Sequence, residues 1–228
     1  MLEAYIHSLY TEDPGRETPA ETRERLKDFF PRNASRRMTQ LGQLVGAVLG
    51  RIGPGENEPI VYATAYGETR ALESYLESFP APSPTLFQTS IHPSGVQQAL
   101  IARQQPIREL FPMTGSDCLT ARALEVALLT GASKTLFCGG EERGTWMLDN
   151  GAASERTFAF ALVLSADPTG AAGHLALTAG EAAFSRSHEP PTATAATRGL
   201  SPFFDLLHMR QAFSGLIAPE RTLTLAWL

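Results

Sequence analysis

Residues 114–142 read TGSDCLTARALEVALLTGASKTLFCGGEE and carry the clearest structural signal in the chain. A small polar segment leads into a helix that is apolar around most of its circumference. A turn at Gly131 follows, and the short strand KTLFC then runs into Gly139-Gly140. An apolar helix of this kind is typical of one buried on nearly all sides. Because Cys118 stands at the start of this helix, the first question is whether it is a nucleophile.

The composition predicts a globular chain that binds neither nucleic acid nor membrane. Of the 228 residues, 43% are hydrophobic, which is enough for one large core. The net charge is -5 and the basic residues are scattered, so no basic stripe can follow a phosphate backbone. The longest apolar run, at 41–50, is too short to span a bilayer, and the N-terminus has no basic segment typical of a signal peptide. Two cysteines without metal-ligand spacing agree with a reducing cytoplasm, and we expect neither metal nor cofactor.

Strand-like runs alternate with helix-like runs, which predicts an α/β fold with a largely parallel or mixed sheet. The polar, low-complexity residues at about 185–199 predict a flexible loop. With no repeat and no clean break, we expect a single domain over 1–228. The expected elements are strands at 3–10, 59–66, 85–91, 134–138, 157–165, 174–180 and 222–228, and helices at 35–50 (cap Ser35), 68–79, 92–105, 118–130 and 200–213 (cap Ser201).

Few side chains in the sequence are candidates for a catalytic role. A helix start beside small residues can lower the pKa of a thiol, which makes Cys118 a candidate nucleophile. The competing interpretation is simple packing, since free cysteines are among the most buried residue types, and Cys138 inside a strand is expected only to pack. Arg122 and Glu125 are spaced to pair on one helix face. Five histidines are expected to be surface or hydrogen-bonded structural residues: His7, His92, His174, His188 and His208.

The order helix, glycine, strand and Gly139-Gly140-Glu141-Glu142 resembles the nucleophile helix and following strand of β-ketoacyl synthases, in the thiolase superfamily. Over nearly its full length the chain resembles the short proteins described as β-ketoacyl synthase N-terminal domain or chain length factor. The resemblance implies half of a thiolase-like fold, with a mixed, mostly parallel sheet flanked by helices. The matching segments, in order, are RRMTQLGQLVGAVLG, VYATAYGETRALESYL, LFQTSIHPSGVQQALIARQQ, MTGSDCLTARALEVALLTGASKTLFCGGEE, FAFALVLSAD and TLAWL.

The chain also departs from an active synthase. The resemblance implies a nucleophile seventeen residues before Gly131, which counts back to Thr114 and leaves Cys118 one helical turn late. It further implies two His, or His and Asn, in HGTGT-like and NSFGFGG-like motifs, and this chain has neither motif. A thiol without a base and an oxyanion partner performs poorly, so we expect no catalytic residue.

The resemblance therefore implies a non-catalytic, chain length factor-like protein of fatty acid, polyketide or aryl polyene assembly. Its partners would be a ketosynthase subunit or an acyl carrier protein, and its apolar walls would help to set the length of an acyl chain. Two alternatives remain open: an acyl transferase or thioesterase that uses Cys118 with a base from another subunit, and a scaffold that binds no acyl group. The apolar helix at 118–130 must be covered by residues 143–228, with SPFFDLLHMRQAF (201–213) as the lid, or by a second subunit, and we expect a homodimer or heterodimer.

Overall fold

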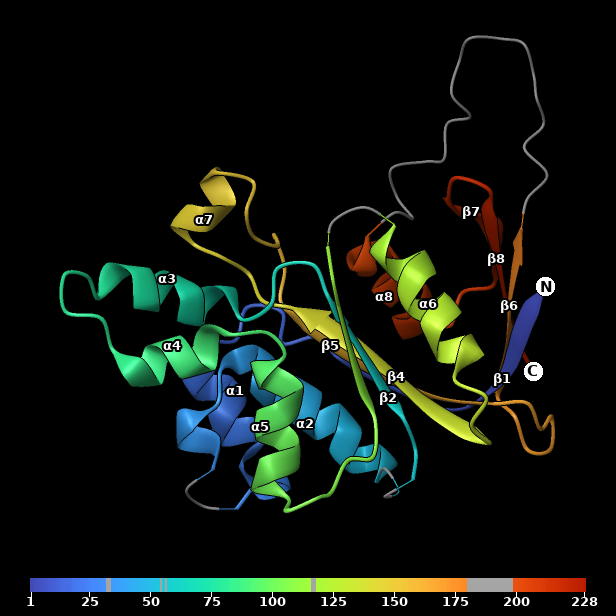
Figure 1. Cartoon of the computed structure of the whole chain (residues 1–228), viewed down its shortest axis with the longest axis horizontal. Coiled ribbons are helices and arrows are strands. Elements are labelled where there is room, and N and C mark those ends of the chain that lie inside the picture. Colours follow the sequence, from blue (N-terminus) through green and yellow to red (C-terminus); the bar gives the residue numbers. More distant parts are fainter. Residues whose placement is uncertain (32–33, 54, 56, 116–117, 180–198) are drawn as a thin grey trace, which may run out of the picture.

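The computed structural model describes residues 1–31, 34–53, 55, 57–115, 118–179 and 199–228. These residues form one eight-stranded sheet in the order β3-β2-β4-β5-β1-β6-β8-β7, with helices on both faces (Figure 1). The strands are β1 Leu2–Glu12, β2 Ile60–Thr64, β3 Leu110–Thr114, β4 Lys134–Glu141, β5 Phe158–Ser165, β6 Gly173–Ala179, β7 Phe213–Ala218 and β8 Arg221–Trp227. The helices are α1 Pro19–Arg25, α2 Gln40–Ile52, α3 Thr69–Glu77, α4 Pro84–Ser90, α5 Ser94–Ala102, α6 Leu119–Leu129, α7 Trp146–Asp149 and α8 Leu200–His208, with short 3₁₀ turns η1 Lys27–Phe29 and η2 Ser35–Arg37.

The sheet is mixed, as expected, and its parallel part is confined to one end. Strand β2 pairs in parallel with β3 and with β4. The other five pairings among the described strands are antiparallel, so parallel pairs are the minority rather than the majority. Strand β5 is buried along its whole length between β4 and β1, in agreement with its apolar character on both faces.

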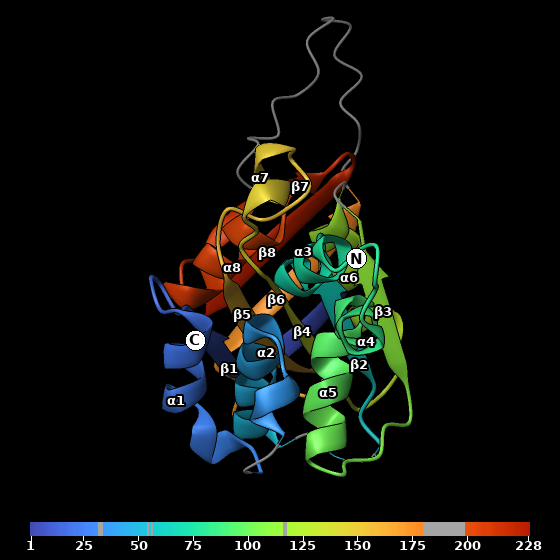
Figure 2. The ribbon, with the colours of Figure 1, turned by 90° about the vertical axis from the view of Figure 1, so that its left-hand side faces the viewer.

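One face of the sheet is covered by α2 and α5, which pack closely because α2 presents glycines every fourth residue (Figure 2). A Cβ on Gly46 would lie 2.5 Å from Cε1 of Phe30 and 3.2 Å from Cβ of Ala99. The glycines in LGQLVGAVLG are therefore explained by a close helix contact. The cap of α2 differs from the expectation: Thr39, not Ser35, accepts a hydrogen bond from the Gly42 amide (2.9 Å).

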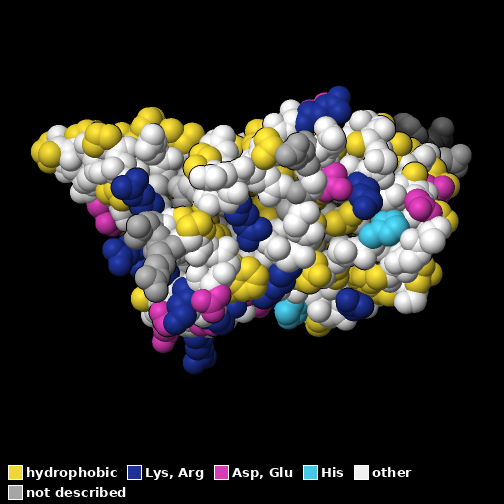
Figure 3. Space-filling view, turned by 90° about the horizontal axis from the view of Figure 1, so that it is seen from below, with side chains coloured by type: hydrophobic (Ala, Val, Ile, Leu, Met, Phe, Trp, Pro, Cys, Tyr) yellow, Lys and Arg dark blue, Asp and Glu magenta, His cyan; other side chains and the backbone are white. Residues whose placement is uncertain are grey.

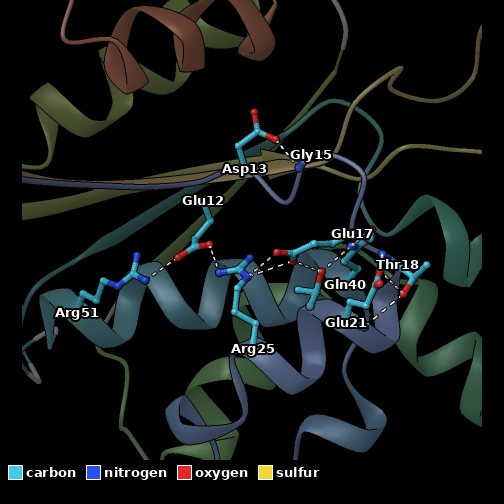
Figure 4. Close-up of polar contacts among 10 residues, drawn as sticks. Glu12, Asp13, Gly15, Glu17, Thr18, Glu21, Arg25, Gln40 and Arg51 are labelled. Carbon is cyan, nitrogen blue, oxygen red and sulfur yellow. Dashed lines mark hydrogen bonds and ion pairs between the residues drawn. The ribbon is translucent and has the colours of Figure 1, made fainter.

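An ion-pair network joins α1 and α2 to the end of β1 (Figure 4). The buried carboxylate of Glu12 pairs with Arg25 of α1 at 2.8 Å and with Arg51 of α2 at 2.6 Å. Arg25 also binds Glu17 in the loop before α1. Because Glu12 has two guanidinium partners, its burial is compensated, and the network fixes both helices against the sheet.

The other face is covered by α6 and α8, and aromatic rings fill the space beneath them. The Phe137 and Phe160 centroids lie 5.3 Å apart, and those of Phe158 and Phe204 lie 4.6 Å apart. Helix α8 and α6 contact each other and share one hydrophobic core. The C-terminal segment therefore packs against α6 within the same chain, which is one of the two ways in which the sequence could cover this helix. The N-cap of α8 is Gly199 rather than Ser201, and residue 213 already begins β7.

Two kinds of element differ from the sequence expectation. Residues 85–91 were expected to form a strand, yet Pro84–Ser90 is helix α4, with Ser83 accepting from the Leu86 amide (3.3 Å) and Pro84 in the first turn. Strands β3 and β7 were not expected, and both are edge strands, where the hydrophobic pattern is weak and a proline such as Pro112 is tolerated.

None of the helices in the described ranges is both long enough and apolar enough to cross a membrane. The loop expected at 185–199, including His188, lies outside the described residues except for Gly199.

Candidate functional site at the carboxyl ends of the parallel strands

The parallel strands β3, β2 and β4 have their carboxyl ends on the same side of the sheet, which is where open α/β sheets bind their ligands. Thr114 ends β3 and pairs in register with Thr64, which ends β2. The Thr114 hydroxyl donates a long hydrogen bond (3.5 Å) to the Ala65 carbonyl. Strand β4 ends beside them with Glu141, and Cys118 begins the helix that follows β3. The topology thus brings Thr114, Cys118 and the segment Gly139–Glu142 to the carboxyl ends of these strands.

Cys118 is the N-cap residue of α6 and has a left-handed backbone, with φ 57° and ψ 23°. Its carbonyl accepts the first helical hydrogen bond, from the Arg122 amide at 3.0 Å. The side chain is half-buried and packs against the aromatic core beneath α6 and α8. A left-handed non-glycine residue at the positive end of a helix is a strained position of the kind found at functional sites.

None of the histidines that the structure describes is paired with this thiol. His7 binds the Asp167 carbonyl at 2.9 Å, and His208 binds the Thr11 hydroxyl at 2.9 Å. His174 lies 3.5 Å from Glu3. His92 stacks on Tyr62, in the core on the opposite face of the sheet from Cys118.

No group of three or more His, Cys, Asp and Glu in the described ranges is placed to hold a metal ion. Cys138 is fully buried in β4, and burial raises the pKa of its thiol above the ordinary range. Its position matches the expectation that it only packs.

Glu141 fastens the loop after β2 to the end of β4. Its Oε1 accepts from the Ala65 amide (2.6 Å), and its Oε2 accepts from the Thr64 hydroxyl (3.0 Å) and the Tyr66 amide (3.2 Å). Burial raises the pKa of this carboxyl group to about 7, against the lowering effect of the hydrogen bonds. Glu142 is buried as well and accepts from the Arg70 amide (2.9 Å), and its pKa is also raised to about 7 by burial.

The two glycines before these acids are needed for close strand approach. A Cβ on Gly139 would lie 2.5 Å from the Ala63 carbonyl, and one on Gly140 would lie 2.3 Å from the Phe158 carbonyl. Gly139–Glu142 is therefore a positioning motif: the glycines bring three strands together and the acids hold the loops that follow. Sequence reasoning found this motif only through its resemblance, because nothing in the sequence alone marks a polar Glu-Glu pair as buried.

The expected pair Arg122–Glu125 is wrong. Glu125 instead pairs with Arg221 of β8 at 3.3 Å, and no ion pair joins it to Arg122 in the part of the chain that the structure describes. Arg122 is exposed, while Glu125 is partly buried. Spacing on a single helix cannot reveal a partner from a distant strand.

A polar crevice of about 860 Å³ opens beyond the ends of β1 and β4. Its charged lining contains as many acids as bases, so it offers no net attraction for an ion of either sign. The charged lining residues are Asp13, Arg16, Glu17, Arg70, Arg143, Asp149, Glu155 and Arg156.

Comparison with solved structures identifies the fold. A chain in the structure of the ketosynthase ApeO in complex with its chain length factor ApeC, from Xenorhabdus doucetiae, matches with a TM-score of 0.69 and 19% identity. The match covers 99% of this chain and 100% of that chain. The fold is thiolase-like. A chain of the ishigamide ketosynthase/chain length factor matches with a TM-score of 0.55 and 13% identity, over 78% of this chain and 68% of that one. No family model and no curated protein matches the chain.

Proposed function

We propose that this protein is a non-catalytic, chain length factor-like partner of a ketosynthase in fatty acid, polyketide or aryl polyene biosynthesis. The observation that carries the proposal is the match with a chain from a ketosynthase–chain length factor complex, which extends over nearly the whole of both chains. The likeness is therefore to a chain of about the same length. Acyl thioesters on an acyl carrier protein would be the substrate class, in the cytoplasm.

The candidate site supports a non-catalytic role. Thr114, at the register that the resemblance assigns to the nucleophile, is engaged with the Ala65 carbonyl. Cys118 has a suitable helix position, but the described histidines are bound elsewhere or lie on the opposite face. A condensing reaction needs a base and an oxyanion partner in addition to a nucleophile.

An exposed apolar surface on α3 and α4 supports association with a second chain. It consists of Leu76, Phe79, Phe87 and Ile91, whose exposed fractions are 43%, 55%, 49% and 46%. Figure 3 shows hydrophobic side chains gathered at the end of the molecule that carries these two helices. Clustered apolar groups on a surface mark interaction sites more often than scattered ones. We assign the subunit contact to this apolar surface of α3 and α4.

The same geometry suggests where an acyl chain would be bounded. The space beneath α6 and α8 is filled by phenylalanine rings whose centroids lie 4.6–6.0 Å apart, so a wall for an acyl chain would be formed by the exposed apolar surface of α3 and α4. In the proposed complex this wall lies between the two subunits, and its bulky side chains set how far an acyl chain extends.

The test is co-purification with a ketosynthase whose gene neighbours that of this chain, followed by reconstitution with an acyl carrier protein. Phe79→Ser and Phe87→Ser should weaken the complex at least tenfold, whereas Met209→Ser, an exposed apolar residue after α8, should not. Cys118→Ala should leave product formation unchanged.

Three results would contradict the proposal. A stable acyl adduct on Cys118 in intact-mass spectrometry would favour the acyl transferase or thioesterase. Complex formation without any effect of apolar-surface variants on product length would favour the scaffold. A single 24.6 kDa species in light scattering that binds neither a hydrophobic dye nor a ketosynthase would exclude association.

A further inference from the structure

A buried polar cluster joins β2 to the first residues of α3 and α5. Tyr62 of β2 is fully buried, and Glu68, the N-cap residue of α3, is only 1% exposed. One Glu68 oxygen accepts from the Gly95 amide in the first turn of α5. The His92 ring, just before α5, stacks on Tyr62 with centroids 5.3 Å apart and planes at 15°.

Several polar atoms of this cluster have no hydrogen-bond partner among the residues that the structure describes. They are the Tyr62 hydroxyl, the second carboxylate oxygen of Glu68 and both ring nitrogens of His92. Space is tight, because a Cβ on Gly95 would lie 2.6 Å from Glu68 Oε1 and 3.1 Å from the Tyr62 hydroxyl. A buried carboxyl group with one oxygen unpaired is poorly compensated as an anion.

The charged groups around Glu68 do not supply a compensating cation. From β4 and the residues after it come Cys138, Glu141 and Glu142, which are neutral or acidic. On α3 itself, Arg70 is directed to Glu73, at 3.5 Å. Burial lowers the pKa of His92, so its ring stays neutral. Burial, together with the nearby charges of Glu142 and Glu141, raises the pKa of Glu68 to about 8.

We propose that Glu68, Tyr62 and His92 form a proton-dependent clamp that holds α3, α4 and α5 on the sheet, and that loss of the Glu68 proton releases these helices. The helices belong to the long connection between β2 and β3, and the clamp touches it at both α3 and α5. An anion at Glu68 faces two further acids and an apolar core, so the folded connection opens to hydrate it. The clamp thereby controls the apolar surface of α3 and α4.

Trp146 offers a local probe of this release, because its indole donates to Glu77 at the end of α3 (2.9 Å). The chain has two tryptophans, so Trp227→Phe leaves Trp146 as the only tryptophan, and excitation at 295 nm avoids the tyrosines. In this background, Trp146 emission should change between pH 6 and 9.5 with a midpoint near the Glu68 pKa of about 8. Amide protection factors should fall at least tenfold in residues 69–102 above the midpoint and stay constant in β1 and β5.

Glu68→Gln keeps an oxygen for the Gly95 amide but cannot ionise, so the transition should disappear. Glu109→Gln, on a half-exposed side chain before β3, should retain it. An identical transition in Glu68→Gln overturns the proposal, as does the absence of a transition in the parent protein. Loss of amide protection in β1 and β5 at the same pH also overturns the proposal. This measurement uses the parent protein, so it does not depend on whether a variant folds. All measurements use the isolated chain, so their outcome is separate from whether a ketosynthase binds.

Discussion

Removal of the Glu141 carboxylate should destabilise the protein far more than removal of an exposed one. In Glu141→Ala, the amides of Ala65 and Tyr66 lose their acceptor inside the protein, while the Thr64 hydroxyl can rotate toward another partner. Both hydrogen bonds are part-buried, so each contributes about 0.5–1.5 kcal/mol, and the expected loss is about 1–3 kcal/mol. This is a measurable share of the roughly 5–15 kcal/mol that stabilises a typical domain.

Glu141→Gln separates hydrogen bonding from side-chain volume. The amide oxygen can still accept from Ala65, but the amide nitrogen would face the Tyr66 N–H, which leaves one donor unpaired. The expected loss is about 0.5–1.5 kcal/mol, between those of the parent protein and Glu141→Ala. The matched control is Glu109→Ala, because the Glu109 side chain is half-exposed and lies 3.8 Å from its ion-pair partner, Arg108. The control should change stability by less than about 0.5 kcal/mol.

The assay is urea unfolding followed by circular dichroism at pH 5, where Glu141 is mostly protonated in the folded protein and the cost of burying its charge is small. The unfolding midpoints of the variants are compared with one common slope of free energy against urea concentration. If Glu141→Ala and Glu109→Ala unfold within about 0.5 kcal/mol of one another, the three hydrogen bonds do not hold the loop after β2, and the positioning role assigned to Gly139–Glu142 is wrong.

Three further predictions follow from burial and packing. The folded pKa values of Glu68, Glu141 and Glu142 lie above the ordinary 4.5, so the folded state binds more protons than the unfolded state between pH 4.5 and about 8. Unfolding free energy should therefore fall as pH rises through this window, by up to about 1.4 kcal/mol per pH unit for each group, and urea midpoints at pH 5, 6.5 and 8 test this. Cys118 should react with iodoacetamide no faster than an ordinary buried cysteine, and rapid labelling would contradict the inert assignment. Gly46→Ala should lower stability by about 1–3 kcal/mol by overpacking against Phe30, whereas Gly199→Ala, with its nearest neighbour at 4.0 Å, should be nearly neutral in thermal unfolding.

The sequence predicted best those elements that are strongly apolar and central. The pattern of α6 and β4 was recognisable because a nearly continuous apolar helix and strand fit only the interior, and β5 was recognisable for the same reason. The edge strands β3 and β7 were missed because an edge buries only part of its side chains. Residues 85–91 have the composition of a strand, but the N-cap at Ser83 and the proline in the first turn, Pro84, favour a helix.

The site was less predictable than the fold. A carboxylate in a loop sequence normally indicates a solvated position, so Glu68, Glu141 and Glu142 gave no sign of burial. Their hydrogen-bond donors come from residues 27 to 77 positions away along the chain, a relation that no local pattern contains. The position of Cys118 was predictable because it depends only on where its own helix begins.

The place of β1 in the sheet has a consequence for the order in which the chain can fold. Both neighbours of this N-terminal strand, β5 and β6, lie beyond residue 157, and Tyr5 pairs with Ser165 and His174. While a ribosome synthesises the first 142 residues, β1 has no strand to pair with, and β4 has only β2. The sheet closes only when β5 enters between them, so formation of the central sheet should be slow, as expected for pairings of high sequence separation. Until then the first strand is exposed to chaperones and to other nascent chains.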